Sequence, residues 1–233
     1  MARKTIELPK PVNAEGGRKT IVVNDPNLSA IGTLELEIKG TAPLIQCAFS
    51  EKAKRMMLEA QCGAAKKKKA PKVPEDEFLN AMHCIGEKPK SMDGLASARF
   101  GHPAVAFKHA MIRAAKASDV AMTDARGMFF IEPDWVDLVE IRSERPPVMR
   151  EDYVRITNVA DIRIRPMFEE WGATLRVRYN ARMCTAQQLV SWAINAGMSN
   201  GVGEWRPNGR NSTGVFGTFA VVSATAEEPK LKD

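Results

Sequence analysis

A stretch near the C-terminus, GMSNGVGEWRPNGRNSTGVFGTFAVV (residues 197–222), combines glycines with aromatic and basic side chains. Trp205, Arg206 and Arg210 lie among the glycines, where a backbone without side chains lets a ligand approach closely. An aromatic ring and guanidinium groups on such a loop can stack on bases and hold phosphates. Glycines that supply positive φ angles in a long helix-to-strand connection explain the same composition, so both interpretations stay open.

A glycine loop that binds a nucleotide is a third interpretation, and the order of the elements argues against it. A P-loop needs G-x-x-x-x-G-K-[ST] ahead of a helix, so that backbone N–H groups and the helix N-terminus face the anion. Here no G-K-[ST] occurs and the predicted helix precedes the glycines. The dinucleotide pattern G-x-G-x-x-G fails because position 206 is arginine. A nucleotide pocket of either kind is therefore excluded, and Gly201 and Gly203 remain candidates for the connection or for contact with a nucleic-acid strand.

A run of lysines, Lys66, Lys67, Lys68 and Lys69, is followed closely by Lys72. It lies in residues 62–99, where prolines, charges and weak periodicity predict a long exposed insertion. Flexible lysines can neutralise a phosphodiester backbone, although charge runs are more often simply solvated. The net charge of +6 and the pI near 9.2 favour a polyanionic partner if the charge is clustered.

Other residue classes give no sign of a metal, a cofactor or a membrane. The cysteines, at positions 47, 62, 84 and 184, form no C-x-x-C pair, so we expect buried thiols in a reducing compartment and no metal site. No apolar run approaches the roughly 18 residues of a membrane span. The N-terminus has no apolar signal region. These features predict a cytoplasmic protein without cofactors.

Apolar periodicity predicts the elements that position the candidate residues. Strands are predicted over 32–40, 127–132, 134–143, 152–158, 161–168, 171–180 and 214–222. Helices are predicted over 50–61 with Ser50 as N-cap, over 100–118, and over 185–197 with Thr185 as N-cap. The expected apolar faces are Leu34, Leu36 and Ile38; Ala53, Met56, Met57 and Ala60; Phe107, Met111, Ala114 and Ala115; and Leu189, Trp192 and Ile194.

The order of these elements predicts an α+β fold. The first half has a strand, the insertion, a helix and further strands, and the second half has a strand, a helix, the glycine-rich stretch and a strand. Two βαβ-type halves are typical of a ferredoxin-like, RRM-like core of the split βαβ kind. Arg163 and Arg165 share one face of a predicted strand, where they line a groove or face water.

Three segments, in order, carry a family resemblance. FGHPAVAFKHAMIRAA is similar to a segment I-P-x-S-S-L-K-G-x-L-R, with Pro103, Lys108 and Arg113 at its proline, lysine and arginine. DIRIRPMFEEWGATLRVRYN resembles a strand pair with a P-x-G-x-x-F turn, and LVSWAINAGMSNGVGEWRPNGRNSTGVFGTFAV resembles a terminal helix, glycine loop and strand. The chain thus resembles the RAMP superfamily, in particular the subunits of CRISPR effector complexes that coat guide RNA, or a stand-alone phage-encoded relative.

The resemblance implies one RAMP-like domain over 32–222, flanked by an N-terminal arm (1–31) and a C-terminal tail (223–233). It also implies a basic thumb within the insertion 62–99, and self-association along a bound single strand, alone or with other effector subunits. The nucleic-acid-binding residues expected on this basis and from the composition are Lys66, Lys67, Lys68, Lys69, Lys72, Lys108, Arg113, Arg163, Arg165, Gly201, Gly203, Trp205, Arg206 and Arg210.

The sequence therefore predicts a non-catalytic protein that binds single-stranded nucleic acid, RNA in preference to DNA. Two alternatives stay open. One is a structural or assembly protein of a phage whose basic loop contacts protein. The other is a metal-dependent RNA-cleaving member of the superfamily that uses Asp76 or Asp93 in the insertion, although neither has a neighbour in sequence that marks it as catalytic.

Overall fold

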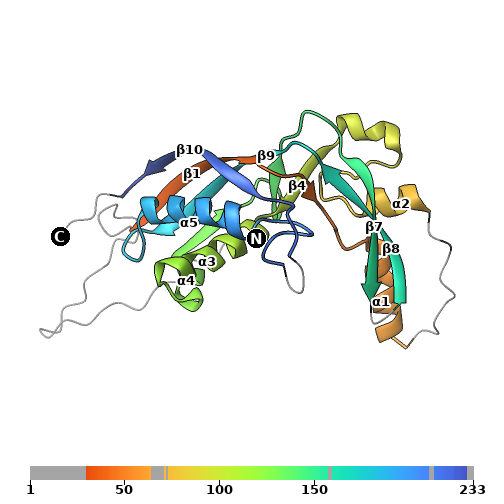
Figure 1. Ribbon diagram of the computed structural model, residues 1–233, viewed down its shortest axis with the longest axis horizontal. Helices are drawn as coiled ribbons and strands as arrows, with labels where there is room; N and C mark the ends of the chain where they lie inside the picture. The colour runs from red at the N-terminus through yellow and green to blue at the C-terminus, as the bar shows by residue number, and fades with distance from the viewer. Residues whose placement is uncertain (1–29, 64–70, 72, 157–158, 210–212, 230–233) are drawn as a thin grey trace, which may run out of the picture.

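The computed structural model describes residues 30–63, 71, 73–156, 159–209 and 213–229 (Figure 1). A core of six elements follows the order strand, helix, strand, strand, helix, strand. These elements are β1 (Ile31–Gly40), α3 (Ala104–Ala115), β5 (Phe129–Glu132), β9 (Gly172–Asn180), α5 (Ala186–Ser199) and β10 (Phe219–Glu227).

The four core strands form one antiparallel sheet in the order β10-β1-β9-β5. The two central strands are therefore the first strands of the two βαβ halves, and each half adds its last strand at an outer edge. Both α3 and α5 lie on the same face of this sheet (Figure 1). This is the split βαβ arrangement, so the predicted ferredoxin-like, RRM-like fold is confirmed.

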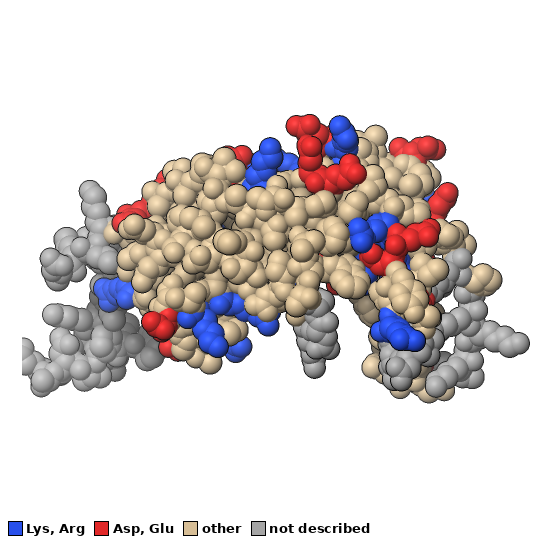
Figure 2. Space-filling view, viewed as in Figure 1, with Lys and Arg blue, Asp and Glu red and all other residues tan. Residues whose placement is uncertain are grey.

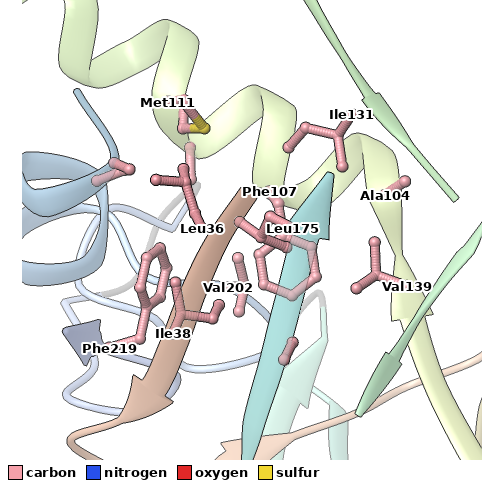
Figure 3. Packing of buried hydrophobic residues seen from close by; sticks show 14 of the residues in the cluster. Leu36, Ile38, Ala104, Phe107, Met111, Ile131, Val139, Leu175, Val202 and Phe219 are labelled. Atoms are coloured by element: carbon pink, nitrogen blue, oxygen red, sulfur yellow. The ribbon is translucent and has the colours of Figure 1, made fainter. Parts of the chain in front are cut away.

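The hydrophobic core lies between the sheet and its two helices (Figure 3). Strand β1 alternates as predicted, with Leu36 and Ile38 almost fully buried and the residues between them exposed. Phe107 and Met111 of α3 pack against them, as the helical stripe predicted. Val202 joins the core from the segment after α5, so the glycine-rich stretch is attached to the core at its beginning.

The segment between β1 and α3 is not the exposed insertion that we expected at residues 62–99. Phe78, Met82 and Leu95 are buried and belong to the hydrophobic cluster, and the helix that carries Phe78 packs against β8 (Val159–Phe168). The lysines at positions 66–69 and 72 lie outside the described residues. The elements are β2 (Leu44–Ile45), α1 (Glu51–Gln61), α2 (Pro74–Asn80), β3 (Cys84–Ile85), the 3-10 helix η1 (Met92–Ser97) and β4 (Arg99–Pro103).

Helix α1 confirms its predicted N-cap but not its predicted burial. The Ser50 side chain accepts a hydrogen bond from the Ala53 N–H at 3.2 Å, as a capping serine does. Met56, Met57 and Leu58 are nevertheless 41%, 58% and 60% exposed. The periodicity of the helix was therefore interpreted correctly, but no described element covers its apolar residues.

A second insertion, between β5 and β9, forms a projecting hairpin of β7 (Val148–Ile156) and β8 (Val159–Phe168). Figure 1 shows this hairpin and α1 at the same end of the molecule, away from α3 and α5. Short β2 pairs with β8, and β6 (Leu138–Ile141) joins β4 and β3 in another small sheet. The strands predicted here exist, but they lie outside the core sheet.

Several predicted boundaries are wrong. The strand predicted from residue 127 begins at Phe129, because η2 (Lys116–Ser118) and α4 (Met122–Met128) precede it. The closing strand is Phe219–Glu227, so it includes residues that we assigned to a tail from 223 onward. Ile194, expected in the core, is 51% exposed. Among the described residues, no helix has the length and apolar character needed to cross a bilayer.

Candidate nucleic-acid interface

The glycine-rich segment after α5 is held by backbone hydrogen bonds to the segment that contains β2. The Glu204 N–H donates to the Ile45 carbonyl at 2.9 Å, and the Gly217 N–H donates to the Pro43 carbonyl at 2.8 Å. Its two sides also pair with each other, since the Val202 N–H donates to the Gly217 carbonyl at 2.9 Å. The segment is therefore an ordered loop, which we call the glycine loop (residues 200–209 and 213–218).

Side-chain hydrogen bonds tie the glycine loop to α3. The Asn200 amide donates to the Ala110 carbonyl at 2.9 Å, and the Asn208 amide donates to the Asn200 side chain at 2.7 Å. The Arg113 guanidinium donates to the Asn208 carbonyl at 2.5 Å. Because the loop and the helix share these contacts, Arg113 is held beside the loop and does not extend freely into solvent.

Basic side chains gather where the glycine loop meets α3 and α4. Arg206 donates to the Gly203 carbonyl at 2.6 Å, which fixes its guanidinium on this side of the loop. Partial burial lowers the pKa of His109, and the positive charges of Arg113, Arg206 and Arg126 lower it further. These four residues, which we call the basic cluster, are therefore close enough to repel an added positive charge.

The arginines of the basic cluster differ from most others in having no acidic partner among the described residues. None of Arg113, Arg126 and Arg206 forms an ion pair with a described residue, whereas arginines on the sheet and the hairpin are paired with carboxylates. Figure 2 shows basic side chains gathered at the lower edge of the view, where Figure 1 places α3 and α4. Unpaired cations on one surface can bind a polyanion without first losing an internal partner.

Lys108 is on α3 but is engaged elsewhere. Its ammonium group lies 3.9 Å from the ring centroid of Phe130, a cation–π distance, and partial burial lowers the pKa of this lysine. Phe130 is half exposed at the outer strand β5. The structure therefore separates Lys108 from the basic cluster and places it beside an exposed aromatic ring.

Arg165 does not have the exposed position that we expected. It is buried and forms ion pairs with Asp152 at 3.2 Å and with Glu204 of the glycine loop at 3.5 Å. These contacts connect the β7–β8 hairpin to the glycine loop. Arg163, two residues earlier, is partly exposed and pairs with Asp161 at 3.0 Å. The two arginines therefore have different environments, although they share a strand face.

The glycines at 201 and 203 are explained by the path of the backbone. Gly203 has φ +78°, and a Cβ there would lie 2.5 Å from the Ile45 carbonyl oxygen. Gly201 has φ +62° and lies against Gly217. Trp205 also has a positive φ of 53° and is half buried, with its indole N–H buried and unpartnered within the described residues. Arg210 lies outside the described residues.

The open face of the core sheet is not an aromatic platform of the RRM kind. RRM sheets stack bases on aromatic side chains of their central strands. Here the exposed side of β1 carries residues such as Glu35 and Glu37, and that of β9 carries Arg176 and Arg178. Arg178 pairs with Glu132 of β5 at 3.6 Å. The arginines of this face are therefore paired with carboxylates, whereas the unpaired arginines of the basic cluster lie on the helix side.

Two histidines, the buried His102 and the partly buried His83, lie near Arg206 of the glycine loop. The rings of His83 and His102 are 5.9 Å apart, and Nδ1 of the buried His102 has no hydrogen-bond partner among the described residues. Burial lowers the pKa of His102 to about 3, and the positive charge of Arg206 and that of His83 in its protonated form act in the same direction. Burial also lowers the pKa of His83 to about 4. Both rings are therefore neutral in the folded protein at neutral pH.

This pair predicts a loss of stability in mild acid. The folded-state pKa values of the two histidines lie below the ordinary value of 6.5. The stability that the neutral rings contribute to the fold is therefore present above pH 6.5 and is lost as the pH falls toward 4 and 3. Between pH 7.5 and 5, we expect the free energy of unfolding of the unaltered protein to fall by about 1–2 kcal/mol more than that of His102→Phe. Urea titrations at both pH values measure this difference, with His109→Gln as control. Equal losses in all three proteins would contradict it.

The aspartates considered for catalysis are not brought together. Asp76 lies in the first turn of α2 and Asp93 in η1, and both are exposed. Within the described part of the chain, no three His, Cys, Asp or Glu side chains are placed to share a metal ion. The structure thus adds no partner to either aspartate.

Two members of the basic cluster were missed by sequence reasoning. His109 is one helical turn before Arg113, so an i, i+4 pairing on a predicted helix was a usable signal. Arg126 belongs to α4, which we did not predict, and its position beside the cluster depends on how α4 folds back from α3. No local pattern in the sequence indicates that proximity.

Comparison with known proteins finds similarity among solved structures only. No protein-family model matches the chain, and no curated protein matches it. Among solved structures, the chain is similar to Csc2 from Thermofilum pendens, with a TM-score of 0.36 and 10% identity over 90% of this chain and 71% of that protein.

Proposed function

We propose that this protein binds single-stranded nucleic acid, RNA in preference to DNA, and associates along the bound strand without cleaving it. The observation that carries the proposal is the basic cluster at the junction of α3, α4 and the glycine loop. Its arginines have no acidic partners among the described residues, while those of the open sheet face are paired. Phosphate groups are the natural partners for such guanidinium groups.

Exposed aromatic rings favour a single strand over a duplex. Phe130 is 50% exposed, Trp135 is 51% exposed and Tyr153 is 65% exposed. Unpaired bases can stack on such rings, whereas the bases of a duplex are already stacked on each other. The preference for RNA and the association along the strand rest on the three sequence segments that resemble the RAMP superfamily.

Fluorescence anisotropy with labelled single-stranded RNA, single-stranded DNA and duplex DNA tests this function. If the three cluster arginines each neutralise a phosphate, affinity for a single strand should fall about 10- to 30-fold between 50 and 200 mM salt. Binding should rank RNA above DNA and single strands above duplex. Affinity that does not depend on salt, or no binding at low salt, would contradict the proposal.

The same mixtures test association and cleavage. Size-exclusion chromatography should show complexes that grow with the length of the RNA, and denaturing gels should show intact RNA with and without Mg²⁺. RNA that is shortened by the unaltered protein but not by Asp76→Asn or Asp93→Asn would favour the nuclease alternative.

A structural role in assembly is the second candidate function. It is favoured by the exposed apolar residues of α1, since an uncovered group of large apolar side chains is typical of a protein–protein contact. Under this alternative the protein binds no oligonucleotide at low salt and forms oligomers only with its protein partner. The anisotropy experiment therefore separates the two functions.

A further inference from the structure

Strand β10 is an open edge of the core sheet. It pairs with β1 on one side only, and no described segment pairs with its other side. Residues 219–227 form this edge, which is long for an unpaired strand in a small sheet. An exposed edge of this length offers a row of backbone donors and acceptors to another strand.

The side chains of β10 do not protect this edge. From Ala220 to Ala226 the strand has no charged residue and no proline, and most of its small side chains are exposed on both faces. Proteins usually block edges with lysines, prolines, short strands or β-bulges, and of these β10 has one bulge, between Val221 and Ser223. The opposite edge, β5, is blocked in this way: it has four residues, ends at Glu132, and carries Phe130 under the Lys108 ammonium group. The two edges of the same sheet therefore differ in accessibility.

The charges around β10 indicate which strand can pair with its open edge. On the open face of the sheet, Lys39 of β1 is opposite Ala220, and Glu227 is opposite Thr33. Lys39 and Glu227 are both exposed, and neither forms an ion pair with a described residue. When two copies of β10 run antiparallel, the end of β10 beside Lys39 of β1 in each copy lies next to the Glu227 end of β10 in the other copy. The dimer then contains two symmetry-related pairs of opposite charges.

We propose that two copies of this chain pair through β10 in antiparallel orientation and join their core sheets into one continuous sheet. The contact uses the same surface of each copy, so it is closed and produces a dimer. It needs no nucleic acid and does not rest on the proposed function. Association along a bound strand is head to tail and would use other surfaces.

Sedimentation velocity of the protein without nucleic acid, over a wide range of concentration, tests this contact. We expect a concentration-dependent dimer. Lys39→Glu and Glu227→Lys should each weaken it about tenfold, because two symmetry-related pairs become repulsive. The two changes combined in one chain should restore most of the affinity, because the charges are then opposite again.

A second pair of variants separates the edge from the rest of the surface. Ala224→Lys places a lysine in the middle of the exposed edge and should give a monomer. Ile194→Lys, at a half-exposed position of α5, should leave the dimer intact. A monomer at every concentration, or a dimer unchanged by Ala224→Lys, would overturn the proposal. If the protein is a monomer and its β10 amides are nevertheless protected from hydrogen exchange, another part of the same chain pairs with this edge.

Nucleic-acid binding by Ala224→Lys keeps the two proposals distinct. The basic cluster is on the helix side of the sheet, so the monomeric variant should bind short RNA with the affinity per chain of the unaltered protein. Loss of the dimer with binding retained supports the β10 contact alone. Loss of RNA binding together with the dimer would mean that β10 belongs to the RNA site, which overturns the edge contact as stated.

Discussion

Arg113→Ala combined with Arg206→Ala is expected to weaken single-stranded RNA binding about 150-fold or more. Each arginine can supply a charge-assisted hydrogen bond to a phosphate, and such a bond contributes about 1.5–3 kcal/mol. The salt dependence should also become shallower, with the slope of log affinity against log salt reduced by about 1.4 for two lost phosphate contacts. Anisotropy titrations at several salt concentrations measure both effects.

The matched control removes the same net charge from paired positions. Arg163→Ala combined with Arg178→Ala takes away two arginines that pair with Asp161 and Glu132. We expect this variant to lose about threefold affinity at most, since exposed paired cations contribute little. An equal loss in both double variants would mean that net charge, and not the basic cluster, determines binding.

A second control addresses the loop itself. Arg113 and Arg206 donate hydrogen bonds to the carbonyls of Asn208 and Gly203, so alanine at either position can loosen the glycine loop. Lysine at both positions keeps the charge but not the planar donor geometry. If the phosphate contact is mainly electrostatic, the double lysine variant should recover most of the affinity for RNA. A thermal melt of each variant reports whether the fold is retained.

Gly217→Ala is expected to lower the free energy of unfolding by about 3–5 kcal/mol. Gly217 has φ +69°, and an added Cβ would overlap the carbonyl oxygen of Val202. The same residue donates to Pro43 and accepts from Val202, so the backbone has no freedom to move away. Urea denaturation at constant pH measures the loss.

Gly86→Ala is the matched control for this substitution. Gly86 has φ +85°, and nothing lies within 4 Å of an added Cβ. It should cost only the conformational penalty of a left-handed residue, about 1–2 kcal/mol. The difference between the two variants measures the close backbone approach in the glycine loop. Equal losses would show that φ alone matters at both sites.

Periodicity made the core predictable. Leu34, Leu36 and Ile38 alternate on β1 because the residue spacing of a strand places them on one face, and this needs no knowledge of the partner. The Thr185 cap of α5 is equally local, since its side chain and Gln188 exchange hydrogen bonds within one turn. Both predictions depended on residues that are neighbours in the sequence.

The candidate site was less predictable because its contacts are between residues distant in sequence. Arg165 looked like an exposed strand arginine, yet Asp152 and Glu204 approach it from a neighbouring strand and from the glycine loop. In α1, the apolar spacing of Met56 and Met57 is that of a buried face, yet no described element covers it. A local pattern specifies which residues share a face, but not whether another element reaches that face.

The position of β1 has a consequence for the order in which the chain can fold during synthesis. Both of its partners, β9 and β10, come much later in the sequence, after the two insertions. A growing chain on the ribosome therefore holds β1 with two unsatisfied edges until its last strands have emerged. Early pairing with a neighbouring nascent chain is then a competing route, and slow elongation near the C-terminus would lengthen the period in which it can occur.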